Sequence, residues 1–282
     1  MRPPVQLYLL IGHPVEKSLS PAAQNAAFNS MNMDAIYVAV DVPESSLADA
    51  VGGVRALGIA GFNVTIPHKI SVMKYLDELD ESAKSAGAVN TVSNRRGRLV
   101  GYNTDGEGAL RALRQAAGPV KGKQVVLIGA GGAARGIAVS LVKAGAELVI
   151  ANRTSEKAKA LASTVSELGG EVSIVPVQKP SLKKTIDCAD MLINATSVGM
   201  HPDSGETLVT SGMMHRNLIV MDIVYKPLQT RFLKEARKAG AKTIDGLGML
   251  VQQGALSFEI WTGKRAPVKV MEAAVRREVG KT

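Results

Sequence analysis

The stretch VVLIGAGGAARGIA, residues 125–138, decides the fold of this chain. An apolar run ends at Ile128, a G-x-G-x-x-A arrangement follows on Gly129, Gly131 and Ala134, and a helical pattern begins. In such a loop one glycine permits the tight turn and the next lets the backbone approach a pyrophosphate. The helix amino terminus then points free N–H groups at the anion. A strand, a loop and a helix in this order predict a dinucleotide site in a Rossmann-type domain.

The strand after this loop indicates which dinucleotide binds. A site that prefers NAD usually carries Asp or Glu at the end of this strand, roughly 20 residues past the loop, to bond the ribose hydroxyls. This chain has ANRTSEK there, residues 151–157. In place of the carboxylate it offers an amide, a hydroxyl and two cations, from Asn152, Thr154, Arg153 and Lys157. These groups suit an added 2′-phosphate, so the predicted cofactor is NADP.

Strand and helix patterns alternate on both sides of the loop. Before it, apolar segments at 5–11, 35–42 and 61–66 alternate with helical patterns at Pro21–Asn32 and Ser45–Leu57. After it, further strands are expected at Glu147–Ala151, Val172–Val175, Met191–Asn194, Leu218–Asp222 and Lys242–Ile244. Such alternation is typical of parallel sheets with helical crossovers, so we predict an α/β chain of two lobes. Helical patterns at Gly246–Thr262 and Val268–Val279 end the chain and are expected to pack back on the first lobe.

Length and composition fit this interpretation. A chain of 282 residues, 46% apolar and 21% charged, is expected to form two domains with large cores. The longest uncharged run, residues 246–258, is too short to cross a bilayer, so no membrane is expected. The single cysteine, Cys188, cannot form an internal disulfide and favours a reducing compartment. We therefore expect a cytoplasmic protein.

The net charge of +9 does not indicate nucleic acid, because the cations are dispersed and aromatic residues make up only 4%. The densest basic cluster, Arg95–Arg98, lies between two β-like runs and is interpreted as a hairpin tip. An anionic small substrate or cofactor accounts for the charge equally well. The histidines lack the spacing of metal ligands and are interpreted as turn or surface residues, so no metal is expected: His13, His68, His201 and His215.

Several motifs occur together, in order and at natural spacing: GHPVEKSLSP, GFNVTIPHK, GAVNTV, GYNTDGEG, GAGGAAR, NRT, NATSVGM, DIVYKP and DGLGMLVQQGALSFEIWTG. Jointly they resemble the shikimate dehydrogenase family over nearly the whole chain. The resemblance implies an NADP-dependent enzyme that reversibly reduces 3-dehydroshikimate to shikimate, on the pathway to chorismate and aromatic amino acids. It implies a substrate-binding domain over residues 1–105, completed by C-terminal helices in 247–282, and a Rossmann-type doubly wound NADP-binding domain over 106–246.

The resemblance also implies the catalytic pair. The lysine that ends N-V-T-x-P-H-K falls on Lys69, and the aspartate of N-T-D falls on Asp105. When hydride reaches the substrate carbonyl carbon, the oxygen gains negative charge and needs a proton. An ammonium group can donate that proton, and a nearby carboxylate keeps it charged. The alternatives are an exposed lysine after a turn and an aspartate that caps a helix.

Further site residues are implied by the same positions. The substrate-binding set comprises Ser18, Ser20, Thr65, Asn90, Asp105, Tyr225 and Gln253. The cofactor-binding set comprises Gly129, Ala130, Gly131, Gly132, Ala133, Asn152, Arg153, Thr154, Lys157, Thr196, Ile223 and Gly246. Short hydroxyl and amide groups suit a polyhydroxylated ring acid, because each can fix one substrate oxygen.

Alternatives from several classes stay open. A methylenetetrahydrofolate dehydrogenase or an amino-acid dehydrogenase would share the two-lobe layout, but NVTIPHK and NTD together argue against both. A sensor related to shikimate dehydrogenases could lose the catalytic pair, whereas Lys69 and Asp105 are both present. A dual quinate/shikimate dehydrogenase is the closest alternative. We expect a small-molecule substrate as the partner, with a monomer or a homodimer as the assembly.

Overall fold

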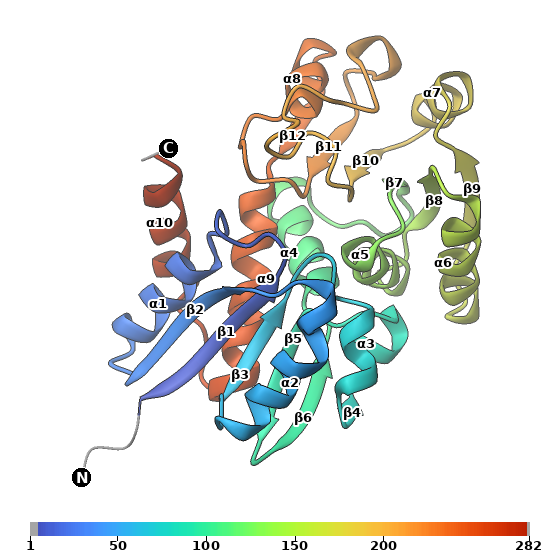
Figure 1. The fold of residues 1–282 in the computed structure, drawn as a ribbon. Helices are drawn as coiled ribbons and strands as arrows, with labels where there is room; N and C mark the ends of the chain where they lie inside the picture. The colour runs from blue at the N-terminus through green and yellow to red at the C-terminus, as the bar shows by residue number, and fades with distance from the viewer. Residues whose placement is uncertain (1–4, 281–282) are drawn as a thin grey trace. The chain divides into compact units, whose positions relative to one another are not determined.

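The computed structural model describes residues 5–280, which form two compact units. The first unit contains the residues up to Gly108 and those from Val251 onward, and the second is Ala109–Leu250. Figure 1 shows the order of their elements along the chain. The unit boundaries fall inside two helices, α4 (Asp105–Ala117) and α9 (Gly246–Thr262).

The first unit is built on a mixed six-stranded sheet in the order β2-β1-β3-β5-β6-β4. Its strands are β1 (Gln6–Gly12), β2 (Ala35–Asp41), β3 (Gly61–Val64), β4 (Glu78–Leu79), β5 (Thr91–Arg95) and β6 (Arg98–Tyr102). β1 pairs in parallel with both β2 and β3, and β5 runs antiparallel to β3 and β6. The tip between β5 and β6 has positive φ at Arg96 and Gly97, which confirms the predicted hairpin.

Helices from both ends of the chain pack in this unit. They are α1 (Ser20–Ser30), α2 (Leu47–Ala56), α3 (Glu81–Ala86) and α10 (Val268–Val279), with short 3-10 turns at Glu44–Ser46 and Ser71–Tyr75. α1 lies against β2 and α10. The Trp261 ring of α9 lies 4.9 Å from that of Tyr8, and its Nε1 donates to the Val92 carbonyl at 2.9 Å. The C-terminal part of α9 is therefore fixed to β1 and β5.

The second unit has an all-parallel sheet in the order β12-β11-β10-β7-β8-β9. Its strands are β7 (Gln124–Ile128), β8 (Glu147–Asn152), β9 (Val172–Pro176), β10 (Met191–Asn194), β11 (Ile219–Asp222) and β12 (Lys242–Ile244). The strand order reverses between β7 and β10. In open α/β sheets ligands bind at such a switch point, outside the carboxyl ends of the strands. The predicted α/β fold with a Rossmann-type sheet is confirmed.

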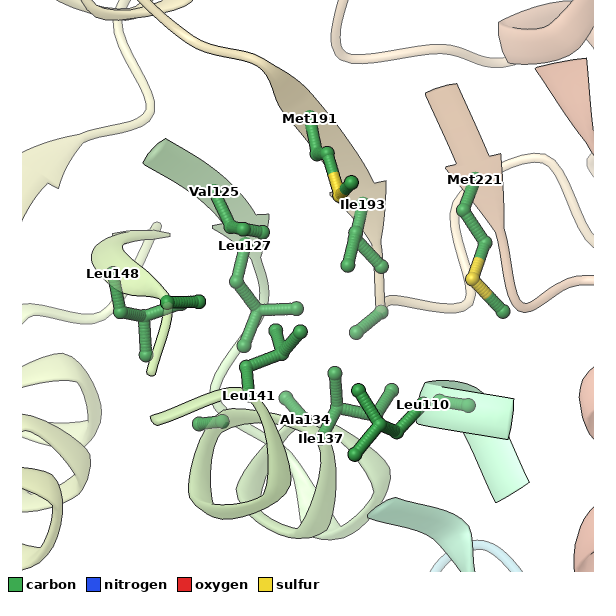
Figure 2. Packing of buried hydrophobic residues seen from close by; sticks show 14 of the residues in the cluster. Leu110, Val125, Leu127, Ala134, Ile137, Leu141, Leu148, Met191, Ile193 and Met221 are labelled. Atoms are coloured by element: carbon green, nitrogen blue, oxygen red, sulfur yellow. The ribbon is translucent and has the colours of Figure 1, made fainter. Parts of the chain in front are cut away.

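Helices cover this sheet: α5 (Gly132–Lys143), α6 (Ser155–Glu167), α7 (Lys179–Asp187), α8 (Arg231–Lys238) and a 3-10 turn at Ser211–Met213. Figure 2 shows Leu127 and Ile193 of the sheet close to Ile137 of α5. These side chains are at most 1% exposed. Because both faces of a parallel sheet are covered, its strands read as continuous apolar runs, and this made them easy to predict.

Candidate active site

Lys69 lies in the turn after β3, and Asp105 is the first residue of α4. Nζ of Lys69 donates to Oδ2 of Asp105 at 2.5 Å, and the two side chains are 13% and 5% exposed. The Lys69 carbonyl accepts the N–H of Val89 at 2.7 Å, which fixes the turn. An ion pair this shielded needs further hydrogen bonds to offset the loss of water.

Asn90 provides one such bond and connects the pair to neighbouring polar groups. Its Nδ2 donates to Oδ1 of Asp105 at 3.1 Å and to Oε1 of Gln253 at 3.2 Å. The same nitrogen lies 2.8 Å from Oγ1 of Thr104, and Oδ1 of Asn90 accepts the Thr104 N–H at 2.7 Å. Asn90 is 2% exposed, so its amide is held in one orientation. The structure therefore brings together four predicted site residues, Lys69, Asp105, Asn90 and Gln253.

A buried polar network that the sequence analysis missed lies beside this cluster. Nδ2 of Asn63 lies 3.0 Å from each of three oxygens, on the Asn90 carbonyl, Thr91 and Ser257. Its Oδ1 accepts the hydroxyl proton of Tyr37 at 2.7 Å. Oγ of Ser257 and Oγ1 of Thr91 are 2.8 Å apart. The available signal was an asparagine in the middle of the apolar strand GFNV, where a polar residue needs partners.

The other substrate positions in the first unit lie near the end of β1. A Cβ placed on Gly12 would be 2.2 Å from Cγ2 of Thr65, so Thr65 packs directly on that glycine. Oγ of Ser18 accepts the N–H of Ser20 at 3.2 Å, and Ser20 begins α1 after the N-cap Leu19. Within residues 5–280 neither serine side chain hydrogen-bonds to Asn90 or Asp105.

Tyr225, the remaining predicted substrate residue, belongs to the second unit, where it follows β11.

The glycine loop of the second unit has the expected local geometry. Gly129 has φ of +117°, a conformation that disfavours side chains, and a Cβ there would lie 2.8 Å from the Ala195 carbonyl oxygen. A Cβ on Gly131 would meet no protein atom within 4 Å, so packing does not require glycine there, whereas a close pyrophosphate would. Gly131 is the N-cap of α5, and Gly132 and Ala133 form its first turn. The residues present therefore fit a dinucleotide.

The predicted phosphate contacts lie at the carboxyl end of β8. Asn152 ends the strand, and its Nδ2 donates to the Thr154 carbonyl at 2.8 Å. Thr154 is the N-cap of α6, yet its side chain makes no capping bond. Arg153, Thr154 and Lys157 are exposed. Their hydroxyl and cationic groups lie at the positive end of a helix and can bind an anion.

The remaining cofactor positions follow the strands on the other side of β7. Thr196 follows β10, Ile223 follows β11 and Gly246 begins α9 just after β12. A Cβ on Gly246 would lie 2.5 Å from the Ile223 carbonyl oxygen, so these two segments touch. All three positions lie at the carboxyl edge of the sheet.

His68 lies in the turn after β3, as predicted, but it is not at the surface. Its side chain is fully buried, and Nε2 lies 2.6 Å from the carbonyl oxygen of Val42. This contact fastens the turn before Lys69 to the end of β2. Turn chemistry alone gave no sign of it, because the partner lies 26 residues away.

Across positions 5–280, no three side chains among His, Cys, Asp and Glu are grouped as metal ligands would be. In the same part of the chain no helix combines the length and apolar character that crossing a bilayer requires.

Comparison with known proteins identifies the family. Three family models match: the shikimate dehydrogenase substrate binding domain at residues 10–92, shikimate/quinate 5-dehydrogenase at 111–247 and the shikimate 5′-dehydrogenase C-terminal domain at 246–276. A curated relative, the NADP⁺ shikimate dehydrogenase of Methanopyrus kandleri, is 52% identical over 270 residues, which is 94% of this chain and 93% of that protein.

Solved structures agree. A shikimate dehydrogenase in complex with NADP⁺ has a TM-score of 0.91 and 47% identity, with 98% of this chain and 96% of that chain covered. The Thermus thermophilus shikimate 5-dehydrogenase, in complex with NADP(H) and shikimate, has a TM-score of 0.86 and 40% identity, with coverages of 96% and 99%. From its sequence motifs, its fold and these matches, this chain belongs to the shikimate dehydrogenase family.

Proposed function

We propose that this chain interconverts 3-dehydroshikimate and shikimate with NADP as cofactor, and that Lys69 is its acid and base, paired with Asp105. The enzyme class, an NADP-dependent oxidoreductase of the shikimate pathway, follows from the family. The shielded ion pair of Lys69 and Asp105 carries the proposal for the catalytic residues, because it places a proton donor within a polar cluster suited to a hydroxylated ligand.

In the reducing direction Lys69 acts as the acid. NADPH held by the second unit supplies the hydride. As the carbonyl carbon is reduced, its oxygen gains negative charge and takes a proton from Nζ of Lys69. Asp105 orients the ammonium through the 2.5 Å bond. In the oxidising direction neutral Lys69 takes up the proton that the substrate hydroxyl releases.

Substrate recognition is assigned to hydroxyl and amide groups. Ser18 and Ser20 are proposed to bind the carboxylate of the ring acid. The ring oxygens are assigned to Thr65, Asn90, Asp105, Tyr225 and Gln253. Buried groups built to bond a hydroxyl discriminate strongly against analogues that lack it, because they would be left without a partner. The fixed amide of Asn90 supports this role, since Asp105 and Gln253 both accept hydrogen bonds from it.

Cofactor recognition is assigned to the carboxyl edge of the second sheet. The pyrophosphate is proposed to lie over the loop from Gly129 to Ala133, with the N–H groups of α5 directed at it. Arg153, Thr154 and Lys157 are proposed to bind the 2′-phosphate, which NAD lacks. Their exposure supports this role, because a phosphate can approach without displacing protein atoms.

Quinate is a second candidate substrate, since one matching family model is described as shikimate/quinate 5-dehydrogenase. Quinate and shikimate differ by one hydroxyl and by ring saturation. We further propose a cytoplasmic location, from the single exposed cysteine, and a monomer or homodimer as the working form.

A crossed assay tests the function. Shikimate or quinate is oxidised with NADP or NAD, and the reduced cofactor is followed by its absorbance. The expected result is efficient oxidation of shikimate with NADP and no turnover of lactate or malate, which cannot engage the serines, Asn90 and Gln253 at once. Failure of both ring acids with either cofactor, despite tight binding of shikimate, would contradict catalysis and favour a sensor.

A further inference from the structure

The carboxyl ends of β10 and β11 carry a buried polar pair with no role so far. Asn194 and Asp222 are register partners and the last residues of their strands. They are 4% and 0% exposed. Nδ2 of Asn194 donates to Oδ1 of Asp222 at 3.0 Å. A carboxylate at the binding edge of a Rossmann sheet, removed from water, needs an explanation.

Asp222 holds two further segments. Its Oδ1 accepts the N–H of Val224 at 3.0 Å, and its Oδ2 accepts the hydroxyl proton of Thr230 at 2.7 Å. Thr230 is the N-cap of α8, where its Oγ1 accepts the Leu233 N–H at 3.3 Å. One carboxylate therefore connects β10, the turn after β11 and the start of α8.

Asn194 in turn holds the loop after β10 through hydrogen bonds to Thr196. Its Oδ1 accepts both the backbone N–H of Thr196, at 3.1 Å, and the Thr196 hydroxyl proton, at 2.7 Å. Oγ1 of Thr196 then accepts the Val198 N–H at 3.1 Å. The Thr196 rotamer is consequently set by Asn194, and the orientation of the Asn194 amide is set by Asp222.

The held loops touch the other cofactor positions. The Cγ2 methyl of Thr196 would lie 3.1 Å from a Cβ on Gly129, so it packs against the glycine loop. The carbonyl of Ile223 crowds Gly246 in the same way. Asp222 thus supports the segments that carry Thr196, Ile223 and Gly246. These three cofactor positions lie on the β10 side of β7, whereas Arg153 lies on the β8 side.

We propose that Asp222 is a positioning residue for the nicotinamide half of the cofactor site, acting through Asn194 on Thr196 and through the Val224 N–H on Ile223. The assignment rests on the proposed function. Burial raises the pKa of Asp222 to about 6 despite bonds from Thr230, Val224 and Asn194. At neutral pH the group is therefore mostly a carboxylate that accepts all three donors, and these partners carry no charge of their own.

The substitution Asp222→Asn tests this role with little change in shape. An amide has one acceptor oxygen, so its NH₂ group must face either Thr230 or the donors from Asn194 and Val224. The matched control is Asp190→Asn. Asp190 directly precedes β10, at the amino ends of the strands of the same sheet. Asp190 accepts from the Gln124 N–H and from Nζ of Lys123, both at 2.9 Å, so it also joins strands through a carboxylate.

Two ligands separate a positioning role from general loosening. Calorimetry with the whole protein measures the Kd of NADP and of adenosine 2′,5′-bisphosphate, which keeps the adenosine and the 2′-phosphate but lacks nicotinamide. For Asp222→Asn we expect the NADP Kd to rise about 10-fold while the bisphosphate Kd stays within about twofold. For Asp190→Asn we expect both to stay within about twofold of the parent.

The assignment is overturned if Asp222→Asn leaves the NADP Kd unchanged, or if it weakens both ligands equally. A parent that binds neither ligand overturns the proposed function itself, which the parent titration reveals before any variant is compared. If Asp222→Asn fails to fold, Thr230→Val removes one donor and keeps the carboxylate. Its NADP Kd should rise about threefold, whereas Thr230→Ser, which retains the hydroxyl, should match the parent.

Discussion

The proposed substrate cluster and the proposed phosphate site differ in how firmly their side chains are held. In the first unit, Asn90 and Asp105 are 2% and 3% exposed, and their polar atoms have partners inside the protein. In the second unit, Arg153, Thr154 and Lys157 are exposed at the start of α6. We therefore expect the first cluster to be assembled during folding and the second to complete its contacts only when an anion binds.

This difference determines what a substitution should cost. A buried group that loses its partner keeps the penalty of desolvation, so changes in the first cluster reduce stability or turnover. An exposed cation returns to water when its ligand is absent, so changes at the phosphate site alter cofactor choice and leave folding intact. Preorganised groups also suit the step in which charge develops, since they need no rearrangement then.

The largest effect is expected for Lys69→Ala. Loss of an acid and base group costs on the order of 100- to 10,000-fold in kcat. Shikimate affinity, measured by calorimetry, should remain close to that of the parent, because the proton matters mainly in the transition state. The matched control is Lys84→Ala, an exposed lysine of the same unit. Near-normal kcat with weakened binding would make Lys69 a substrate clamp instead.

The next effect concerns stability. Replacing Asn63 by alanine removes a donor from Thr91 and Ser257 and leaves the Tyr37 hydroxyl without its acceptor. The free energy of unfolding should fall by roughly 3 kcal/mol in urea titrations. Asn29→Ala, an exposed asparagine of α1, should change it by less than about 0.5 kcal/mol. Equal costs for both variants would show that the buried network does not stabilise the first unit.

A smaller effect is expected for Arg153→Ala. A charged hydrogen bond is worth roughly 1.5 to 3 kcal/mol, so NADP affinity should weaken by about 10- to 150-fold while NAD is barely affected. The measured quantity is the ratio of kcat/KM for the two cofactors. Lys159→Ala, on the same helix and also exposed, is the control. A parent that prefers NAD, or a ratio that Arg153→Ala leaves unchanged, contradicts phosphate recognition by this segment.

The smallest effect is a pH dependence of stability at Asp222. Burial raises its folded pKa from 3.8 to about 6. Between these two pH values the carboxyl group is therefore protonated in the folded state and ionised in the unfolded state. Stability from this group is full below the unfolded pKa and is lost as pH rises through about 6. Relative to that of Asp222→Asn, the free energy of unfolding of the parent should fall by roughly 2 kcal/mol between pH 4 and pH 7. A difference between the two proteins that stays constant with pH would refute the shift.

Sequence patterns were sufficient for the second sheet. Its strands are apolar runs between turns, and the bounds of β10 and β12 match the prediction. The glycine loop was recognisable because its residues are adjacent in the chain. The two-residue β4 and the short α3 were missed, since neither is long enough to show a period.

The polar contacts could not be predicted in the same way. Asn63 meets Ser257 across 194 residues, and Asp222 meets Asn194 across 28. Such pairs are fixed by sheet order and helix packing, which local patterns do not contain. The burial of His68 against Val42 likewise depends on a contact across 26 residues. The pairing of Lys69 and Asp105 came from the resemblance to a family, and the fold adds the 2.5 Å bond between them.

If Lys69 and Asp105 transfer the proton as one pair, their contributions to kcat cannot be independent. A double-mutant cycle of Lys69→Ala and Asp105→Asn measures this, and the pair Lys69→Ala with Arg153→Ala serves as the control between units. The predicted result is that the Lys69/Asp105 double variant loses about as much kcat as the worse single variant, while the Lys69/Arg153 effects on kcat/KM multiply. Losses that multiply for Lys69 and Asp105 would contradict a shared role in proton transfer.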